Sequence, residues 1–470
     1  MRHHCNSILL LSAFICITLV TANSCFSKPS TAYVEEAILA SDIGQNQKPI
    51  GITNEFTMDQ ETIYCFVKVS NVQKETKVST RWILKEGDLE GKGDIEVGCY
   101  EQVINSPTII SFGLNQEKDY LLPMGKYEII ISLDDQAATS SHFFVTIPPT
   151  PSIKILGDNN VSSNLSDNKH VSYSWALKET NFTLELDIPI GLYDSYASKT
   201  RIFTSDPSVY SLYVSHPDDD EYLSHIAEAI KQMAQEAGFT AEDYLKSIIR
   251  FVRSISYSDD FQSTGFDEYP KYPIETLVDG TGDCEDSSIL LVSILQAAGI
   301  PSVLLLTNNS VIPGHSSVGI AGEGTSDLIS YEYDDKKYFY VEATNIDLAI
   351  GHVLEMYNPE DFLVVPLDPL PAITYTIDDI RAGRVYRIRA YVKNIGSIPV
   401  EGIKLVSIIY SEDEEVVVFQ ESEPFSLSID QEAIVTFYLP YKKAGNHELN
   451  VYAEWGDSVG YTLIAPFTGP

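Results

Sequence analysis

The sequence predicts a multidomain protein in which an α+β domain lies between two all-β sandwich domains. Its 470 residues correspond to about three domains of ordinary size. Short strand-like segments dominate residues 50–147 and 371–470, whereas helical patterns are concentrated in residues 152–367 between them. Hydrophobic residues make up 44% of the chain and charged residues 21%, which is typical of folded globular domains and not of disordered chains.

The first segment has the features of an export signal. Residues 8–20 form an apolar stretch of 13 residues, whereas a membrane-spanning helix needs about 20. Small residues then precede Cys25, so residues 1–24 are predicted to be a signal peptide and residues 25–49 a tether. Cys25 would begin the mature chain, where it is a candidate for lipid attachment. We therefore expect an exported protein, secreted or at the cell surface, that contacts a membrane only through such a lipid.

Two regions have the pattern of β-sandwiches. Residues 50–147 contain short alternating or apolar segments separated by turn residues, and strands at this spacing are typical of an immunoglobulin-like sandwich. A proline-rich linker, residues 148–151, ends this domain. Residues 371–470 return to the β pattern, and the segment VKNIG (392–396) resembles the opening strands of adhesion-type immunoglobulin-like domains in prokaryotic surface proteins.

The middle region, residues 152–367, combines strand-like segments with predicted helices. The helices cover Glu221–Ala237, Ala241–Ile255 and a segment that begins near Cys284 and ends at Gly299. The last helix is apolar nearly all round, so we expect it to be buried. Three strand-like runs follow it, PSVLLLT, HSSVGIAG and YFYVEAT, and this order of elements predicts an α+β core.

The cysteines have different expected roles. Of six in the chain, Cys65, Cys99 and Cys284 lie beyond the predicted signal peptide and Cys25. Cys65 and Cys99 belong to one predicted β-domain, and in an oxidising compartment they are candidates for a disulfide. Cys284 is then an unpaired thiol.

Cys284 opens a set of residues suited to nucleophilic catalysis. It lies at the predicted start of the buried helix, where free N–H groups and a partial positive charge favour a thiolate and can hold an oxyanion. His315 follows 31 residues later at the head of a strand, where it can act as base and acid. Glu342 follows after a further 27 residues within an apolar strand, where a carboxylate needs a partner.

The order of these elements resembles the transglutaminase-like superfamily, whose core is papain-like. Two segments carry the resemblance, FVRSISYSDD (251–260) and DEYPKYPIETLVDGTGDCEDSSILL (267–291). Two shorter features add to it, Gly-His before a β-run and an acid before Ala-Thr. All four are similar to features of prokaryotic secreted transglutaminase-like proteins. It implies that Cys284 is the nucleophile, His315 the general base and acid, and Glu342 the acid that orients the imidazole. The family more often has Asp in the third position.

Several neighbouring residues have competing interpretations. His352 is a second histidine candidate on the substrate side, and Asp334 and Asp347 are alternative acids. Tyr269 and Tyr272 either line the substrate cleft or pack their rings on the core beside a proline-stiffened turn.

Acidic residues are numerous, and we expect most of them to be structural or solvated. Asp283, Glu285 and Asp286 are suited to cap the helix that begins at Cys284. The acidic runs at 218–221, 259–260 and 412–415 lack the spacing of a calcium-binding loop, so the sequence predicts solvated surface and no metal site.

The net charge and the absence of cofactor motifs narrow the function. A net charge of −36 disfavours nucleic-acid binding, because the surface repels phosphate backbones. The sequence contains no glycine-rich nucleotide fingerprint and no zinc-binding motif, so no cofactor is expected. The expected partner is a protein or peptide substrate, with cell-wall peptide included.

The favoured function is exported, cysteine-dependent acyl transfer at an amide through a Cys–His–Glu triad and a thioester intermediate. With water as acceptor the protein is a peptidase or amidase, and with a lysine amine it crosslinks proteins. The alternative is a catalytically inactive transglutaminase-like module that serves as a cell-surface binding or adhesion protein. Glu342 in place of Asp favours this alternative, whereas the retained Cys–His pair favours catalysis.

Overall fold

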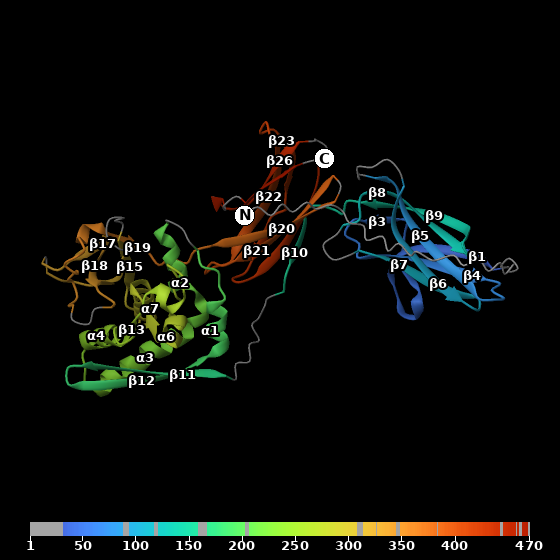
Figure 1. Ribbon diagram of the computed structural model, residues 1–470. Coiled ribbons are helices and arrows are strands. Elements are labelled where there is room, and N and C mark those ends of the chain that lie inside the picture. The colour runs from blue at the N-terminus through green and yellow to red at the C-terminus, as the bar shows by residue number, and fades with distance from the viewer. Residues whose placement is uncertain are drawn as a thin grey trace. The chain divides into compact units, whose positions relative to one another are not determined.

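The structure is a computed structural model (Figure 1). It describes residues 32–468 apart from 88–93, 117–120, 158–166, 203–205, 308–313, 326, 345–347, 383, 442–444, 457 and 460–462. The predicted signal peptide and Cys25 lie outside the described residues, as does Asp347. Contacts divide the chain into two compact units with their boundary between Thr146 and Ile147, and residues 119–121 are grouped with the second unit. The predicted multidomain, mostly β architecture is confirmed.

The first unit is a sandwich of two sheets, with strand orders β2-β1-β4-β7 and β3-β9-β8-β5-β6. Its core is aromatic and aliphatic, and Trp82, Tyr127 and Phe143 are fully buried at its centre. The strands are β1 (Tyr33–Ile43), β2 (Pro49–Ile52), β3 (Glu55–Thr57), β4 (Thr62–Ser70), β5 (Thr76–Gly87), β6 (Ile95–Ile104), β7 (Thr108–Asn115), β8 (Gly125–Leu133) and β9 (Gln136–Thr146).

Two expectations for this unit are corrected. Residues 33–43 form β1, which pairs with β4 along most of its length, so the sandwich begins inside the segment predicted as a tether. Cys65 and Cys99 do not form the expected disulfide, and both are free thiols. Cys65 is buried on β4, whereas Cys99 is exposed on β6 in the other sheet. The alternating pattern identifies both strands but not the sheet to which each belongs.

The middle domain, within the second unit, has an α+β core. Its helices are α1 (Ile190–Ala197), α2 (Ser211–Ser215), α3 (Asp220–Glu236), α4 (Ala241–Val252), α5 (Asp260–Ser263), α6 (Pro273–Asp279) and α7 (Cys284–Ala297). Its strands are β11 (Asn168–Leu177), β12 (Thr180–Pro189), β13 (Ser256–Tyr257), β14 (Thr281–Gly282), β15 (Ser302–Thr307), β16 (Ser316–Ala321), β17 (Ser330–Tyr333), β18 (Lys336–Val341) and β19 (Phe362–Val365).

Helix α7 is the centre of this domain. Residues 289–292 and 294–295 are completely buried, as the apolar sequence predicts, and they pack against α3, α4, α6 and the strands β15 and β16. The β11–β12 ribbon lies against the helices, with β11 in contact with α4 and α6 (Figure 1). Asp283 caps the helix, since its side chain accepts the backbone N–H of Asp286. The helix that bears Cys284 is therefore fixed on all sides.

The sheet of the middle domain determines where His315 and Glu342 lie. Its order is β17-β18-β16-β15-β19 and its pairs are antiparallel. Val318 of β16 pairs with Val341 of β18, so the start of β16 lies beside the end of β18. His315 directly precedes β16 and Glu342 directly follows β18. The register thus brings these two residues to the same end of the sheet.

The C-terminal sandwich also belongs to the second unit, and it has its own apolar core. One sheet has the order β10-β25-β21-β20, and the other is built around β22 and β26. Residues 152–155, predicted as part of the middle domain, instead form β10 of this sandwich by pairing with β25. The strands are β10 (Ser152–Ile155), β20 (Ile373–Ala382), β21 (Val385–Asn394), β22 (Val400–Ser411), β23 (Val416–Glu421), β24 (Phe425–Leu427), β25 (Glu432–Pro440), β26 (Asn446–Trp455), β27 (Ser458–Val459) and β28 (Leu463–Thr468).

Among the described residues, no helix combines the length and the hydropathy that a bilayer crossing requires.

Candidate active site

His315 and Glu342 form a buried pair at the end of the central sheet. His315 Nε2 lies 2.8 Å from Glu342 Oε2, and the glutamate is completely buried. This contact occupies one imidazole nitrogen and leaves Nδ1 for proton exchange with a third group. The contact fixes the orientation of the imidazole ring.

Glu342 is held by donors on both carboxylate oxygens. Tyr340 Oη donates to Oε2 at 2.9 Å, while the backbone N–H and the hydroxyl of Thr344 donate to Oε1 at 3.1 and 2.7 Å. Arg253 Nε also donates to the backbone oxygen of Glu342 at 2.9 Å. Burial alone would raise the pKa of Glu342, but His315 and Thr344 outweigh it and lower the pKa to about 2. Glu342 is therefore a carboxylate at neutral pH.

This lowered pKa predicts an acid-dependent loss of stability. The pKa falls from 4.5 to about 2 on folding, so the stabilisation is complete above pH 4.5 and is lost as the pH falls towards 2. We expect the difference in free energy of unfolding between the wild-type chain and Glu342→Gln to shrink as the pH falls from about 5 to about 3. Chemical denaturation across this range measures it, and a difference independent of pH would contradict the assignment.

Cys284 is the first residue of α7, which packs against β16, the strand that directly follows His315. The backbone N–H of Ser316, the residue after His315, lowers the pKa of the Cys284 thiol. The thiol is half-buried and donates to Glu285 Oε2 at 3.1 Å, rather than to His315. His315 and Glu342 therefore meet at one end of the sheet, and the Cys284 thiol contacts a neighbouring carboxylate at the start of α7.

The charge around Cys284 opposes ionisation in this resting arrangement. Burial is the largest effect that raises the pKa of the Cys284 thiol, and the carboxylates of Glu285 and Asp283 add to it. The Ser316 N–H acts in the opposite direction. The surroundings therefore favour the protonated thiol.

Two tyrosines near the thiol were not identified from the sequence. The Tyr357 ring stacks on the His315 imidazole, with centroids 4.5 Å apart and an angle of 7° between the planes. Tyr257 belongs to β13, which pairs with β14 directly ahead of Cys284. Burial, and then the charge of Cys284, raises the pKa of Tyr257 to about 12. Tyr257 lies within the FVRSISYSDD segment, but nothing in that segment singles it out, and the position of Tyr357 follows only from packing.

The other predicted site residues have structural surroundings. Tyr272 is buried among aromatic rings, and its centroid lies 4.5 Å from that of Tyr196. The Tyr269 hydroxyl accepts from Arg201 at 2.8 Å and donates to Glu275 at 3.1 Å. His352 is exposed, and its Nδ1 lies 3.2 Å from the Ile350 backbone oxygen. The packing interpretation of the two tyrosines is thus the one that their contacts favour.

Gly282 allows the close approach that shapes the start of α7. A Cβ at this position would lie 2.6 Å from Asp286 Cβ, and Asp286 is completely buried. We expect Gly282→Ala to displace the first turn of α7, to lower the free energy of unfolding by about 2 kcal/mol and to slow alkylation of Cys284. Denaturation and iodoacetamide labelling measure both effects. Gly314→Ala is the control, since a Cβ there meets nothing within 4 Å; equal effects in the two variants would contradict the prediction.

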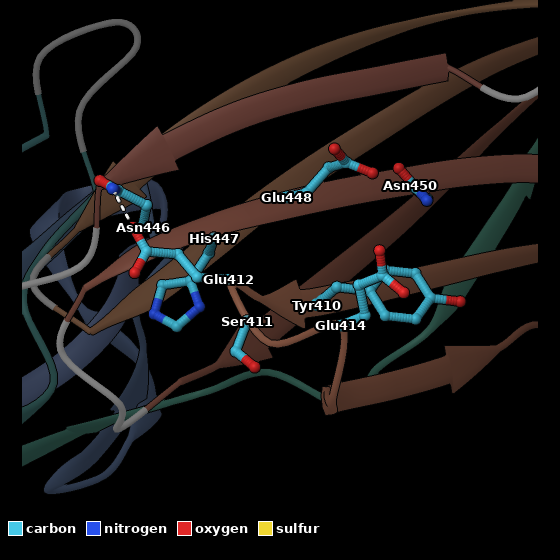
Figure 2. Close-up of a pocket in the computed structure, with 8 residues that line it drawn as sticks. All are labelled: Tyr410, Ser411, Glu412, Glu414, Asn446, His447, Glu448 and Asn450. Carbon is cyan, nitrogen blue, oxygen red and sulfur yellow. Dashed lines mark hydrogen bonds between the residues drawn. The ribbon is translucent and has the colours of Figure 1, made fainter.

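A surface pocket of about 580 Å³ lies elsewhere, on the C-terminal sandwich (Figure 2). It is formed along β22 and β26 and is lined by Glu412, Glu414 and Glu448 among others, with a hydrogen bond from Asn446 to Glu412. It contains none of the three residues described above. Ser411 of β22 and His447 of β26, which are paired in register, also line it.

Comparisons with known proteins give limited guidance. No family model matches the chain, and no curated protein matches it. Among solved structures, red sea bream transglutaminase is 9% identical with a TM-score of 0.18, over 88% of this chain and 82% of that one. An immunoglobulin-like protein from Pseudomonas aeruginosa is 12% identical with a TM-score of 0.18, over 24% of this chain and 96% of that one. A CARDB domain from Pyrococcus furiosus is 17% identical with a TM-score of 0.18, over 21% of this chain and 89% of that one.

Proposed function

We propose that the middle domain is a papain-like, transglutaminase-like catalytic domain that performs acyl transfer at an amide. The observation that supports this most strongly is the buried His315–Glu342 pair, with the two atoms 2.8 Å apart, together with a cysteine at a helix N-terminus. The charge of the buried Glu342 carboxylate must be compensated, and the His315 imidazole does so through Nε2. The second imidazole nitrogen, Nδ1, is then available to the Cys284 thiol. The same three residue types in the same order are implied by the resemblance of the sequence to the superfamily.

The proposed reaction begins with proton transfer from the Cys284 thiol to His315. The thiolate attacks the carbonyl carbon of a glutamine side chain or a peptide bond, and N–H groups at the start of α7 stabilise the oxyanion. The C–N bond breaks, the imidazolium gives its proton to the leaving amine, and a thioester remains. Water or a second amine then attacks the thioester, His315 accepts the proton of the incoming group, and the thiol is regenerated. Glu342 holds the ring and stabilises the imidazolium throughout.

The proposal also includes the setting of the reaction. The apolar stretch at residues 8–20 supports export, and Cys25 supports attachment of a lipid. The flanking β domains would bind or position a protein substrate at the cell surface, cell-wall peptide included. The strongly acidic surface favours a substrate with neutral or basic character.

A direct assay separates the two acyl acceptors. The mature chain is incubated with casein and a fluorescent primary amine, and both amine incorporation and ammonia or peptide release are measured. If the acceptor is an amine, we expect amine incorporation together with ammonia release, and if it is water, we expect ammonia or peptide release alone. Cys284→Ser should form none of these products, whereas Cys99→Ser, which alters an exposed free thiol, retains activity. Product formation by Cys284→Ser would contradict the proposal.

A second function is favoured by one observation. The Cys284 thiol donates to Glu285, and burial and two carboxylates raise its pKa, which suits a resting thiol more than a primed nucleophile. In this alternative the domain is an inactive transglutaminase-like module that binds or adheres at the cell surface. Labelling of Cys284 by iodoacetamide no faster than labelling of Cys99 would favour it.

A further inference from the structure

The most exposed apolar side chains of the middle domain lie in two segments, one next to Cys284 and one next to His315. Among the described residues of this domain, four large apolar side chains are more than half exposed, and we call them the apolar rim: Tyr257 (64%), Phe261 (67%), Phe266 (58%) and Met356 (60%). Exposed aromatic and methionine side chains that occur close together, and not singly, are typical of interaction surfaces.

Tyr257 is held against the residues that lead into α7. It belongs to β13, where it pairs with Gly282 of β14, and Gly282 lies two residues before Cys284. The backbone N–H of Ser258 also donates to the carbonyl of Gly282 at 3.0 Å. The backbone of the first segment is therefore fixed close to the start of the helix that carries the thiol.

Phe261 and Phe266 continue the apolar rim along the same segment. Phe261 belongs to α5, and a carboxylate oxygen of Asp260, the first residue of this helix, lies within 4.8 Å of one of Asp283. The Phe266 ring stacks on the Tyr269 ring, with centroids 6.0 Å apart and an angle of 20° between the planes. This stacking holds the Phe266 ring in place although most of its surface is exposed.

Met356 places exposed apolar surface next to the imidazole. It directly precedes Tyr357, whose ring stacks on that of His315. Burial is the main cause of the raised pKa of Tyr357, and the charges of Cys284 and Glu342 add to it. The flexible methionine side chain suits contact with substrate side chains of varied shape.

Acidic residues surround the apolar rim. Three belong to the segment that follows β13: Asp259, Asp267 and Glu268. Burial and Cys284 raise the pKa of Tyr257 most, and the carboxylates of Asp283 and Glu285 raise it further. The rim therefore lies in a negative field, which repels acidic peptides and attracts lysine or arginine side chains.

We propose that the apolar rim binds a large apolar side chain next to the reactive amide of the substrate, and that the surrounding acids favour a lysine or arginine beside it. This inference rests on the proposed acyl transfer and names its substrate class, a peptide segment with apolar and basic residues around the amide. The rim residues determine specificity, because they contact the peptide away from the bond that breaks.

Chloroacetyl dipeptides that alkylate Cys284 test the apolar rim. The mature chain is treated with chloroacetyl-Phe-Lys-amide or with chloroacetyl-Gly-Lys-amide, and labelling is followed by mass spectrometry. We expect Cys284 to react about tenfold faster with the phenylalanine compound, because partial burial of its ring favours binding by this factor. Exposed Cys99 should react with both at similar rates. Chloroacetyl-Phe-Glu-amide should label Cys284 more slowly in ~50 mM NaCl, and the difference should shrink in ~500 mM NaCl.

Variants connect this preference to the rim. Phe261→Ala and Phe266→Ala should each reduce the ratio of the phenylalanine rate to the glycine rate to less than about threefold. Tyr333→Ala is the matched control, because Tyr333 is an exposed aromatic residue that pairs with Lys336, at the opposite end of β18 from Glu342. The midpoint of thermal unfolding establishes that each variant folds. Equal rates of the two compounds in the wild-type chain, or a ratio unchanged in both phenylalanine variants, would overturn the proposal.

The same ratio separates the rim from the proposed reaction. Both compounds alkylate one thiol, so the ratio does not depend on how reactive that thiol is. A high ratio without acyl transfer to or from casein would support the rim and contradict the reaction. Acyl transfer with a ratio of one would contradict the rim alone.

Discussion

His315→Ala is expected to slow alkylation of Cys284 by about 100-fold to 1,000-fold, because a positioned base contributes a factor of this size. The physical reason is that proton removal from Cys284 then depends on water, while burial and the carboxylates of Glu285 and Asp283 keep the pKa of the thiol high. The measurement is the rate at which iodoacetamide labels Cys284 at pH 7.5, followed by mass spectrometry of the peptide that contains it.

His352→Ala is the matched control for this experiment. His352 is exposed and contacts a backbone oxygen, so its loss should change the labelling rate by less than about twofold. Equal rates in His315→Ala and the wild-type chain would show that the imidazole does not act on the thiol. A similar decrease of the labelling rate in both variants would mean that the substitutions act by disturbing the fold of the domain and not through the imidazole of His315.

Glu342→Ala is expected to lower the free energy of unfolding by about 3–5 kcal/mol, the typical cost of removing one partner of a buried charge pair. Four donors lose their acceptor: the ring of His315, the hydroxyl of Tyr340, and the N–H and hydroxyl of Thr344. Labelling of Cys284 should slow as well, because the imidazole is no longer oriented. Urea denaturation, with labelling below the unfolding transition, measures the two effects separately.

Glu342→Asp tests the contribution of the longer side chain. Aspartate preserves the charge, but its side chain is one methylene shorter. Its carboxylate therefore lies farther from His315 than Glu342 Oε2, which is 2.8 Å from the imidazole. We expect an intermediate loss of stability and of labelling. A Glu342→Ala variant as stable as the wild-type chain would contradict the assignment of Glu342 as the buried partner of His315.

The sequence predicts those features that depend on local pattern and order. The buried helix that begins at Cys284, its cap at Asp283 and the apolar strands on either side of His315 follow from the hydrophobic period and capping chemistry. The meeting of His315 and Glu342 follows from antiparallel pairing once the strands are in register.

Features that depend on packing between distant segments cannot be read from the sequence in this way. Asp260, the first residue of α5, is buried, and nothing in an Asp-Asp pair indicates this burial. The stacking of Tyr357 on His315 joins residues that are 42 positions apart in the chain. The separation of Cys65 and Cys99 depends on the sheet to which each strand belongs.

The central claim is that Cys284 forms a thioester with the help of His315. The most direct test is mass spectrometry of the intact mature chain, quenched soon after mixing with p-nitrophenyl acetate, followed by peptide mapping and hydroxylamine treatment. The account predicts a hydroxylamine-sensitive acetyl group on Cys284 that forms rapidly in the wild-type chain and is lost in His315→Ala. Acetylation of Cys284 at the rate of exposed Cys99, and unchanged in His315→Ala, would contradict it.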